Sequence, residues 1–176
     1  MELSKYEALK QYGSWKSCSC DTTTGISMIN NDQCVINYDH VKRYYMNSLK
    51  KSEENAASVD TLVQDENGHL YMIEFKNGEI DNKEIRNKVI ESLLIFCDIT
   101  KNTIEFTRQN MDFILIYNPD LIHIKPLEQR ALFLARLGKS FCPFHGLDKF
   151  YGFCVQKAYM MTAKEFTDNM LHMMSV

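Results

Sequence analysis

Two acidic residues and a lysine in one short stretch are the side chains of this sequence best suited to chemistry. Residues 58–78, SVDTLVQDENGHLYMIEFKNG, contain Asp60, Glu74 and Lys76. Successive side chains of a strand alternate faces, so Glu74 and Lys76 point the same way. Two carboxylates on adjacent strands can hold Mg²⁺ or Mn²⁺, hard cations that prefer oxygen ligands, and the carbonyl of Phe75 could add a ligand. Such an ion polarises a phosphate and acidifies a bound water, and Lys76 can stabilise developing negative charge or orient the water.

Whether Asp60 joins the other two side chains depends on the register of the predicted hairpin. If Asn67 and Gly68 formed a two-residue type I′ turn, Asp60 and Glu74 would face opposite sides of the sheet. A three-residue loop over 66–68, built from a type I turn and a glycine bulge, suits the aspartate before it and the glycine at its end. In that register Asp60 lies directly opposite Glu74, with Cβ atoms ~5 Å apart. We predict the three-residue loop.

The residues around the acid pair are mainly apolar on both faces of the predicted hairpin. Charged groups inside such strands are costly to desolvate unless they are paired or bound to metal. A solvated glutamate–lysine pair on a surface strand is the competing interpretation. The apolar surroundings and the facing aspartate favour a functional role. The flanking cross-strand pairs are Val59 with Phe75, Thr61 with Ile73, Leu62 with Met72, and Val63 with Tyr71.

Helices and strands alternate around the predicted hairpin. Asp39 can cap the helix before it, and capping boxes are indicated at Asp81 with Glu84 and at Thr162 with Glu165. This order indicates an α/β sandwich rather than an all-α or all-β domain. The predicted elements are helices over 3–12 and 39–51, strands 59–64 and 70–76, a helix over 81–96, strand 113–117, helix 126–137, strand 152–160 and a helix from 162.

Composition is that of one ordinary globular domain. The chain has 176 residues, of which 45% are hydrophobic and 24% charged, and its net charge is −3. We expect a single domain, 1–176, with a core over about residues 39–160 and an N-terminal extension over 1–38. Neither a signal peptide nor an apolar run long enough for a bilayer is visible, so we expect a soluble, cytoplasmic protein without a membrane partner.

The net negative charge does not by itself indicate nucleic-acid binding. Two local groups are basic: residues 42–51, and Lys83 with Arg86 and Lys88. Solvated helix faces are the competing interpretation for each. These groups matter only if a catalytic centre lies beside them, because phosphodiester chemistry requires contacts with phosphates.

The pattern resembles that of the PD-(D/E)XK nuclease superfamily, which includes restriction enzymes, junction resolvases and repair nucleases. The superfamily motif is an Asp at the start of one core strand and Glu-x-Lys on the next. The chain matches it with Asp60 and with Glu74-Phe75-Lys76, followed by a helix and further strands. Val59 stands where the motif's name has Pro. The resemblance covers roughly residues 39–117.

This resemblance implies a restriction endonuclease-like fold of αβββαβ type, with a mixed central sheet and helices on both faces. It implies a Mg²⁺-dependent nuclease that hydrolyses phosphodiester bonds in DNA. Asp60 and Glu74 would be the metal ligands and Lys76 the catalytic lysine. Many members take another acid from the preceding helix; Glu54 and Glu53 are the candidates, and the spacing does not choose between them.

Two further expectations follow from the same resemblance. The helix after the Glu-x-Lys strand often supplies a polar residue to the site, and Lys83 or Arg86 could do so here. Many members dimerise to cut both strands, so a homodimer is a possible assembly.

Two other classes compete with a nuclease. One is a catalytically inactive nuclease-like module that binds nucleic acid or a protein partner. The other is a small zinc-bound interaction domain using Cys18, Cys20 and Cys34, or Cys142 with His145, although paired CxxC motifs are lacking. The sequence contains neither a G-x-S-x-G elbow nor a phosphate-binding GxxxxGK loop.

Overall fold

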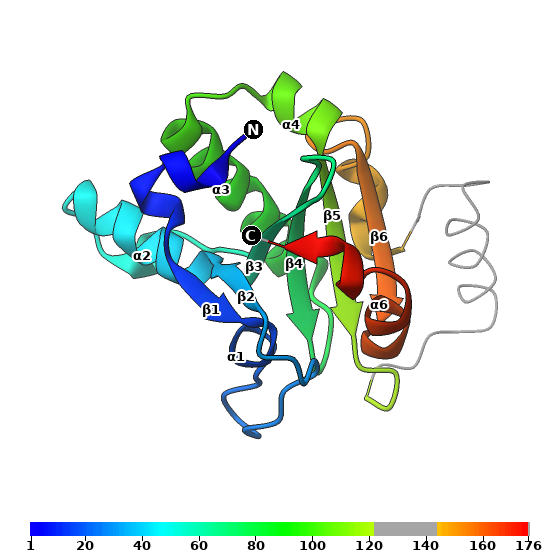
Figure 1. The fold of residues 1–176 in the computed structure, drawn as a ribbon. Helices are drawn as coiled ribbons and strands as arrows, with labels where there is room; N and C mark the ends of the chain where they lie inside the picture. Colours follow the sequence, from blue (N-terminus) through cyan, green and yellow to red (C-terminus); the bar gives the residue numbers. More distant parts are fainter. Residues whose placement is uncertain (122–143, 176) are drawn as a thin grey trace.

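A mixed, open β-sheet forms the centre of the structure, a computed structural model that describes residues 1–121 and 144–175 (Figure 1). Six strands follow one another across this sheet in chain order, and β7 pairs with β3 beside β2. Neighbours from β1 to β4 are antiparallel, whereas β4, β5 and β6 are parallel. The strands are β1 Tyr12–Ser14, β2 Cys34–Asn37, β3 Thr61–Asp65, β4 Leu70–Lys76, β5 Met111–Tyr117, β6 Lys157–Thr162 and β7 Met174–Ser175.

Helices cover both faces of this sheet, which confirms the expected α/β class. On one face α2 and α3 pack over a core that includes Phe96 and Leu62. On the other, α1 and α6 bring Trp15 and Phe166 against Ile73, with the two ring centroids 5.2 Å apart. The helices are α1 Trp15–Cys18, α2 Tyr38–Ser48, α3 Asn82–Thr100, α4 Ile104–Asn110 and α6 Ala163–Asn169, with 3₁₀ turns at Leu3–Lys5, Glu7–Leu9, Glu53–Asn55, Phe144–Lys149 and Leu171–Met173.

The β3–β4 hairpin has the register predicted from its turn. Leu62 lies opposite Met72, and the same register sets Asp60 against Glu74. Gly68 closes the loop with a φ of +83°, and its N–H donates to the carbonyl of Asp65 at 3.0 Å. The Asp65 carboxylate also accepts main-chain N–H groups from within the loop. Local turn chemistry therefore sets the pairing of the two strands.

The N-terminal region differs from the expected short helix over 3–12. It forms two 3₁₀ turns, which bury Leu3 and Leu9, and then β1. A segment this short is a marginal helix on its own, so tertiary contacts decide its structure. Strands β1 and β2 supply those contacts by pairing Tyr12 with Ile36. Neither strand was predicted from the sequence.

Other differences concern helix caps and element boundaries. Asn37, not Asp39, caps α2. At α3, Asp81 accepts from the N–H of Lys83 without a reciprocal bond from Glu84, whereas the capping box at Thr162 is confirmed. The strand expected at 152–160 begins only at 157, and α4 was not predicted.

Two further points concern the helices. The helix predicted over 126–137 lies outside the described residues. Within residues 1–121 and 144–175, no helix has both the length and the apolar character needed to cross a bilayer.

Replacing Gly68 with alanine tests the role of the loop. A Cβ in the left-handed region costs about 1–2 kcal/mol, so Gly68→Ala is expected to lower the free energy of unfolding by about 1 kcal/mol in urea denaturation. Gly78→Ala is the matched control, because a Cβ at Gly78 would meet no atom within 4 Å. Equal stability of Gly68→Ala and the unmodified protein would show that this loop does not constrain the hairpin.

Candidate active site

Asp60 and Glu74 lie at the same end of the hairpin, on the face covered by α2 and α3. Asp60 directly precedes β3, and its N–H donates to the carbonyl of Ile73 at 3.1 Å. The Asp60 side chain reaches across to β4, where Oδ2 accepts the N–H of Phe75 at 2.7 Å. Glu74 is fully buried, and its Oε2 has no hydrogen-bond partner. The cross-strand bond fixes the aspartate beside a carboxylate that is only partly satisfied.

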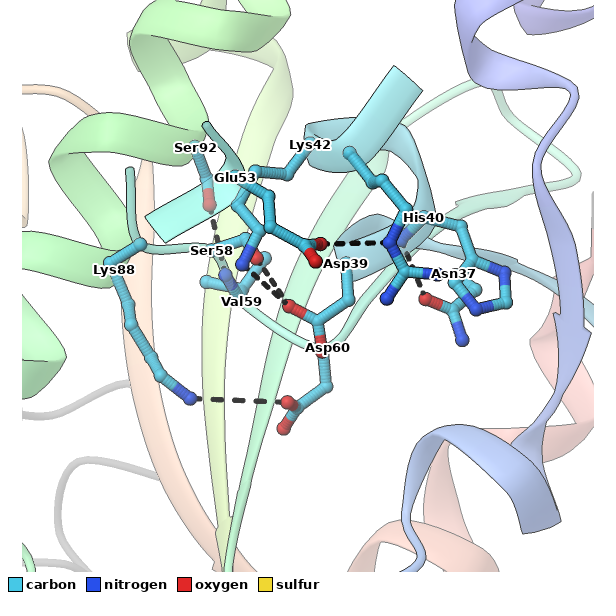
Figure 2. Close-up of polar contacts among 12 residues, drawn as sticks. Asn37, Asp39, His40, Lys42, Glu53, Ser58, Val59, Asp60, Lys88 and Ser92 are labelled. Carbon is cyan, nitrogen blue, oxygen red and sulfur yellow. Dashed lines mark hydrogen bonds and ion pairs between the residues drawn. The ribbon is translucent and has the colours of Figure 1, made fainter. Parts of the chain in front are cut away.

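Two lysines and a third carboxylate surround this pair. Lys88 Nζ lies 2.7 Å from Glu74 Oε1 and 4.0 Å from Asp60 Oδ1, the second contact being drawn in Figure 2. Lys76 Nζ lies 3.7 Å from Glu74 Oε1 and 2.7 Å from Glu84 Oε1. We call Asp60, Glu74, Lys76, Glu84 and Lys88 the carboxylate–lysine cluster. It brings together the three residues predicted from the sequence and adds two from α3.

One face of helix α3 lies against the cluster and the start of β3. Glu84, Lys88 and Ser92 share this face because they recur at four-residue spacing. The hydroxyl of Ser92 accepts the N–H of Val59 at 2.9 Å (Figure 2). Beside this bond, the N–H of Ala57 donates to the carboxylate of Glu91, the residue before Ser92 on α3. These bonds hold the chain entering β3 against α3, so the helix and Asp60 keep a fixed relation.

Burial raises the pKa values of both carboxyl groups, and a neighbouring carboxylate adds to each shift, Asp39 for Asp60 and Asp60 for Glu74. Burial raises the pKa of Asp60 from 3.8 to about 6, although the Lys88 charge and the Phe75 N–H oppose the shift. Burial and the Asp60 charge raise the pKa of Glu74 well above 4.5. Burial also acts to lower the Lys88 pKa, but the charges of Glu74 and Asp60 outweigh it and raise that pKa. Both carboxyl groups therefore hold their protons more readily than exposed acids despite the two lysines, and an added cation would favour their ionised forms.

A cavity of about 450 Å³ opens beside the cluster. Asp60, Phe75 and Lys76 form part of its wall, so the aspartate and the catalytic-lysine candidate face space that a substrate could enter. Lys76 is 14% exposed, whereas Glu74 is sealed behind it. The remaining wall residues are Ser17, Cys18, Ser19, Cys20, Asp21, Thr22, Met28, Asn37, Asp39, Asn77, Gly78 and Glu79.

The N-terminal segment supplies much of that wall, which the sequence did not reveal. Its loop is tied to the sheet through amide side chains at the strand ends. Asn77 Nδ2 donates to Asp21 Oδ2 at 3.0 Å, and Asn118 Nδ2 donates to Asn77 Oδ1 at 2.7 Å. These bonds join the loop to the ends of β4 and β5. Residues regarded as an extension are therefore part of the site's architecture.

Neither candidate for the upstream acid lines the cavity. Glu53 forms an ion pair with Arg43 at 2.8 Å, and Glu54 is exposed on the same 3₁₀ turn. The acid from the preceding helix that lines the cavity is Asp39, which accepts a hydrogen bond from the Ser58 hydroxyl (Figure 2). Asp39 was assigned to capping in the sequence, but Asn37 performs that function, and the Asp39 carboxylate instead contacts Ser58 and, at 3.5 Å, Lys42.

The basic residue that α3 supplies also differs from the expected ones. Lys83 and Arg86 are exposed, whereas Lys88 reaches both carboxylates. The four-residue spacing puts Glu84 and Lys88 on one face of the helix, but it does not show that this face meets the hairpin.

The described residues include no ready-made group of three or more metal-binding side chains. In residues 1–121 and 144–175, no three His, Cys, Asp or Glu side chains are grouped to hold one ion. Cys18 and Cys20 line the cavity, Cys34 is exposed, and Cys142 lies outside the described residues. The oxygen donors closest together in the cluster are the carboxylates of Asp60 and Glu74 and nearby main-chain carbonyls. These are hard oxygen donors of the kind that Mg²⁺ and Mn²⁺ accept.

Comparisons with protein-family models, with curated proteins and with solved structures found no match to the chain.

Replacing Asp60 with asparagine is expected to stabilise the metal-free protein at neutral pH. The folded pKa of Asp60 lies above its ordinary value, so stability from its protonated form is complete below about pH 4 and is lost as pH rises through about 6. The asparagine side chain cannot ionise and can still accept the Phe75 N–H. The free energy of unfolding near pH 7, measured in urea with chelator, should therefore rise by about 1–3 kcal/mol.

An exposed aspartate provides the control for this experiment. Asp32→Asn should leave the unfolding free energy unchanged across the same pH range. A variant Asp60→Asn that is no more stable than the unmodified protein near neutral pH would contradict a raised Asp60 pKa.

Proposed function

We propose that this chain is a Mg²⁺- or Mn²⁺-dependent nuclease of the PD-(D/E)XK type, acting on DNA. The observation that carries the proposal is the pair of carboxylates, fully buried Glu74 and partly buried Asp60, that face each other beside two lysines at a cavity lined by Asp60 and Lys76. Buried charge of this kind is destabilising and is typical of sites where ionisation serves a function.

The arrangement of elements around the pair supports a restriction endonuclease-like core. Helix α2 precedes an antiparallel hairpin that carries Asp60 on one strand and Glu74-Phe75-Lys76 on the next. Helix α3 then crosses to β5, which lies parallel to β4. This is the order of helices and strands in which the superfamily motif is expected.

The available donors fit a hard divalent cation. Asp60 Oδ1 and the unpartnered Glu74 Oε2 are the side-chain atoms that would hold it, with the carbonyl of Phe75 as an additional ligand. The chemistry that such an ion supplies is polarisation of a phosphate and a lower pKa for a bound water. An ion bound there also removes the repulsion between the two carboxylates, so the folded protein gains stability from binding.

Lys76 is the residue that would act on substrate. Its ammonium group lies at the cavity wall and is oriented by Glu84 at 2.7 Å. A fixed positive charge at this position stabilises the negative charge that develops on a phosphate under attack. The wall formed by the N-terminal segment would position the substrate and exclude water from the opposite side.

One observation favours a second candidate function, a catalytically inactive module that binds nucleic acid or a protein partner. The Lys88 ammonium group lies 2.7 Å from Glu74 and supplies part of the positive charge that a metal ion would bring. A permanent internal cation can preserve the fold of a nuclease after its chemistry has been lost.

A nuclease assay with a lysine variant distinguishes the two functions. Purified protein with Mg²⁺ or Mn²⁺ is expected to cut plasmid or single-stranded DNA, and chelator should abolish the cutting. Lys76→Ala should lower the rate by about 100-fold or more, because it removes the charge aimed at the reacting phosphate. RNA is included as a comparison substrate.

Lys83→Ala is the matched control, since Lys83 is exposed on α3. Its cutting rate should equal that of the unmodified protein. Cutting that survives Lys76→Ala would place the activity elsewhere, and no cutting of any substrate would favour the inactive module.

The additional acid is tested by a pair of charge-neutralising variants. Asp39 lines the cavity and Glu54 does not, so Asp39→Asn should lower the cutting rate by about tenfold and raise the metal concentration needed for half-maximal rate. Glu54→Gln should change neither quantity. The reverse result, with Glu54→Gln impaired and Asp39→Asn unaffected, would show that the acid on the 3₁₀ turn serves the site.

A further inference from the structure

Lys88 contacts both carboxylates that would hold a metal ion, its Nζ lying 2.7 Å from Glu74 Oε1 and 4.0 Å from Asp60 Oδ1. We propose that the Lys88 ammonium group is the internal counter-ion of Asp60 and Glu74, and that a divalent metal ion binds by displacing it toward Glu84. This inference rests on the proposed function, because it concerns how the same site takes up its metal. Lys88 would then be a positioning residue that sets metal affinity, while Lys76 remains at the cavity.

The charges of the carboxylate–lysine cluster support an exchange of cations. Lys76 pairs with the solvated Glu84, so the inner part of the cluster is Asp60 and Glu74 with Lys88. With these three groups ionised, two carboxylates face one ammonium group, which leaves one negative charge. A divalent ion added beside Lys88 would reverse this to one positive charge. The same ion taken up while Lys88 moves out to Glu84 leaves the inner part neutral. Burial makes any net charge costly, so exchange is the favoured outcome.

The geometry also gives Lys88 a second partner to move to. Its Nζ lies 2.7 Å from Glu74 Oε1 and 3.8 Å from Glu84 Oε1, and the Glu84 side chain is 45% exposed. A short movement along α3 therefore carries the ammonium group from a buried carboxylate to a solvated one. Lys76 already contacts Glu84 at 2.7 Å, so it needs no such movement.

Glu74 has an oxygen that the lysines do not satisfy. Its Oε1 accepts from Lys88, but its Oε2 is buried without a hydrogen-bond partner. A monovalent ammonium group thus leaves part of this carboxylate uncompensated. A divalent ion can contact the free oxygen and carries twice the charge.

Measurement of Mn²⁺ binding tests the exchange without reference to activity. Titration of the full chain, followed by the electron paramagnetic resonance of free Mn²⁺, is compared between the unmodified protein and Lys88→Gln. The glutamine removes the charge but keeps a donor for Glu74. The variant is expected to bind Mn²⁺ more tightly by about tenfold or more, a size typical of coupling between two sites.

Two further variants define where the effect arises. Arg86→Gln removes a positive charge from an exposed position on the same helix and should leave the Mn²⁺ affinity unchanged. Glu74→Gln introduced together with Lys88→Gln should abolish the gain, because it removes the carboxylate for which the two cations compete.

A second measurement uses the unmodified side chain, so it holds even if Lys88→Gln fails to fold. Nitrogen-15 NMR of labelled lysine ammonium groups, with the Lys88 signal assigned through Lys88→Arg, is followed as Mg²⁺ is added. The signal of a paired, partly buried Lys88 should shift or broaden to that of an exposed lysine as the metal binds. A Lys88 signal that stays unchanged while Mg²⁺ binds would overturn the exchange.

The possible results separate this inference from the proposed function. Equal or weaker Mn²⁺ binding by Lys88→Gln overturns the exchange and leaves the nuclease proposal standing. No binding by either protein overturns both. Binding by Lys88→Gln alone supports competition between Lys88 and metal, contradicts the nuclease proposal, and identifies the chain as the inactive module.

Discussion

The register of one antiparallel hairpin determines whether this protein has a site at all. Side chains alternate along a strand, so a slip of one residue between β3 and β4 would turn Asp60 to the opposite face from Glu74 and Lys76. The three-residue loop ending at Gly68 sets the register from one end. At the other end of the hairpin, the bond from the Phe75 N–H to the Asp60 carboxylate holds the same register.

Electrostatic cost distinguishes this cluster from an ordinary surface ion pair. Exposed pairs such as Lys10 with Glu7 contribute little to stability and impose no strain on the fold. Glu74 instead is fully buried on the interior strand β4, repelled by Asp60 and with one oxygen unpartnered. A hydrophobic residue in its place would avoid the desolvation entirely. Retention of Glu74, a buried acid, opposite Asp60 and beside a cavity is understandable if the two carboxylates bind a cation.

The parts of the structure that depend on local chemistry could be predicted, and those that depend on helix placement could not. The hairpin followed from its turn residues and its alternating pattern, so the sequence sufficed to set Asp60 against Glu74. To choose Lys88 over its basic neighbours, one must know how α3 is rotated about its own axis. To recognise Asp39 as a residue of the cavity wall, one must know where α2 lies against β3. Strands β1 and β2 are short and pair across a connection over residues 15–33, so their sequences carry little signal of their own.

Diffraction from crystals soaked in Mn²⁺ would test the assignment of the site most directly. Anomalous scattering locates the ion independently of any assumption about ligands. The expected result is a peak within coordination distance of both the Asp60 and Glu74 carboxylates. Crystals in which Mn²⁺ is absent from this position, or bound only elsewhere on the chain, would contradict a metal-dependent active site built on these two residues.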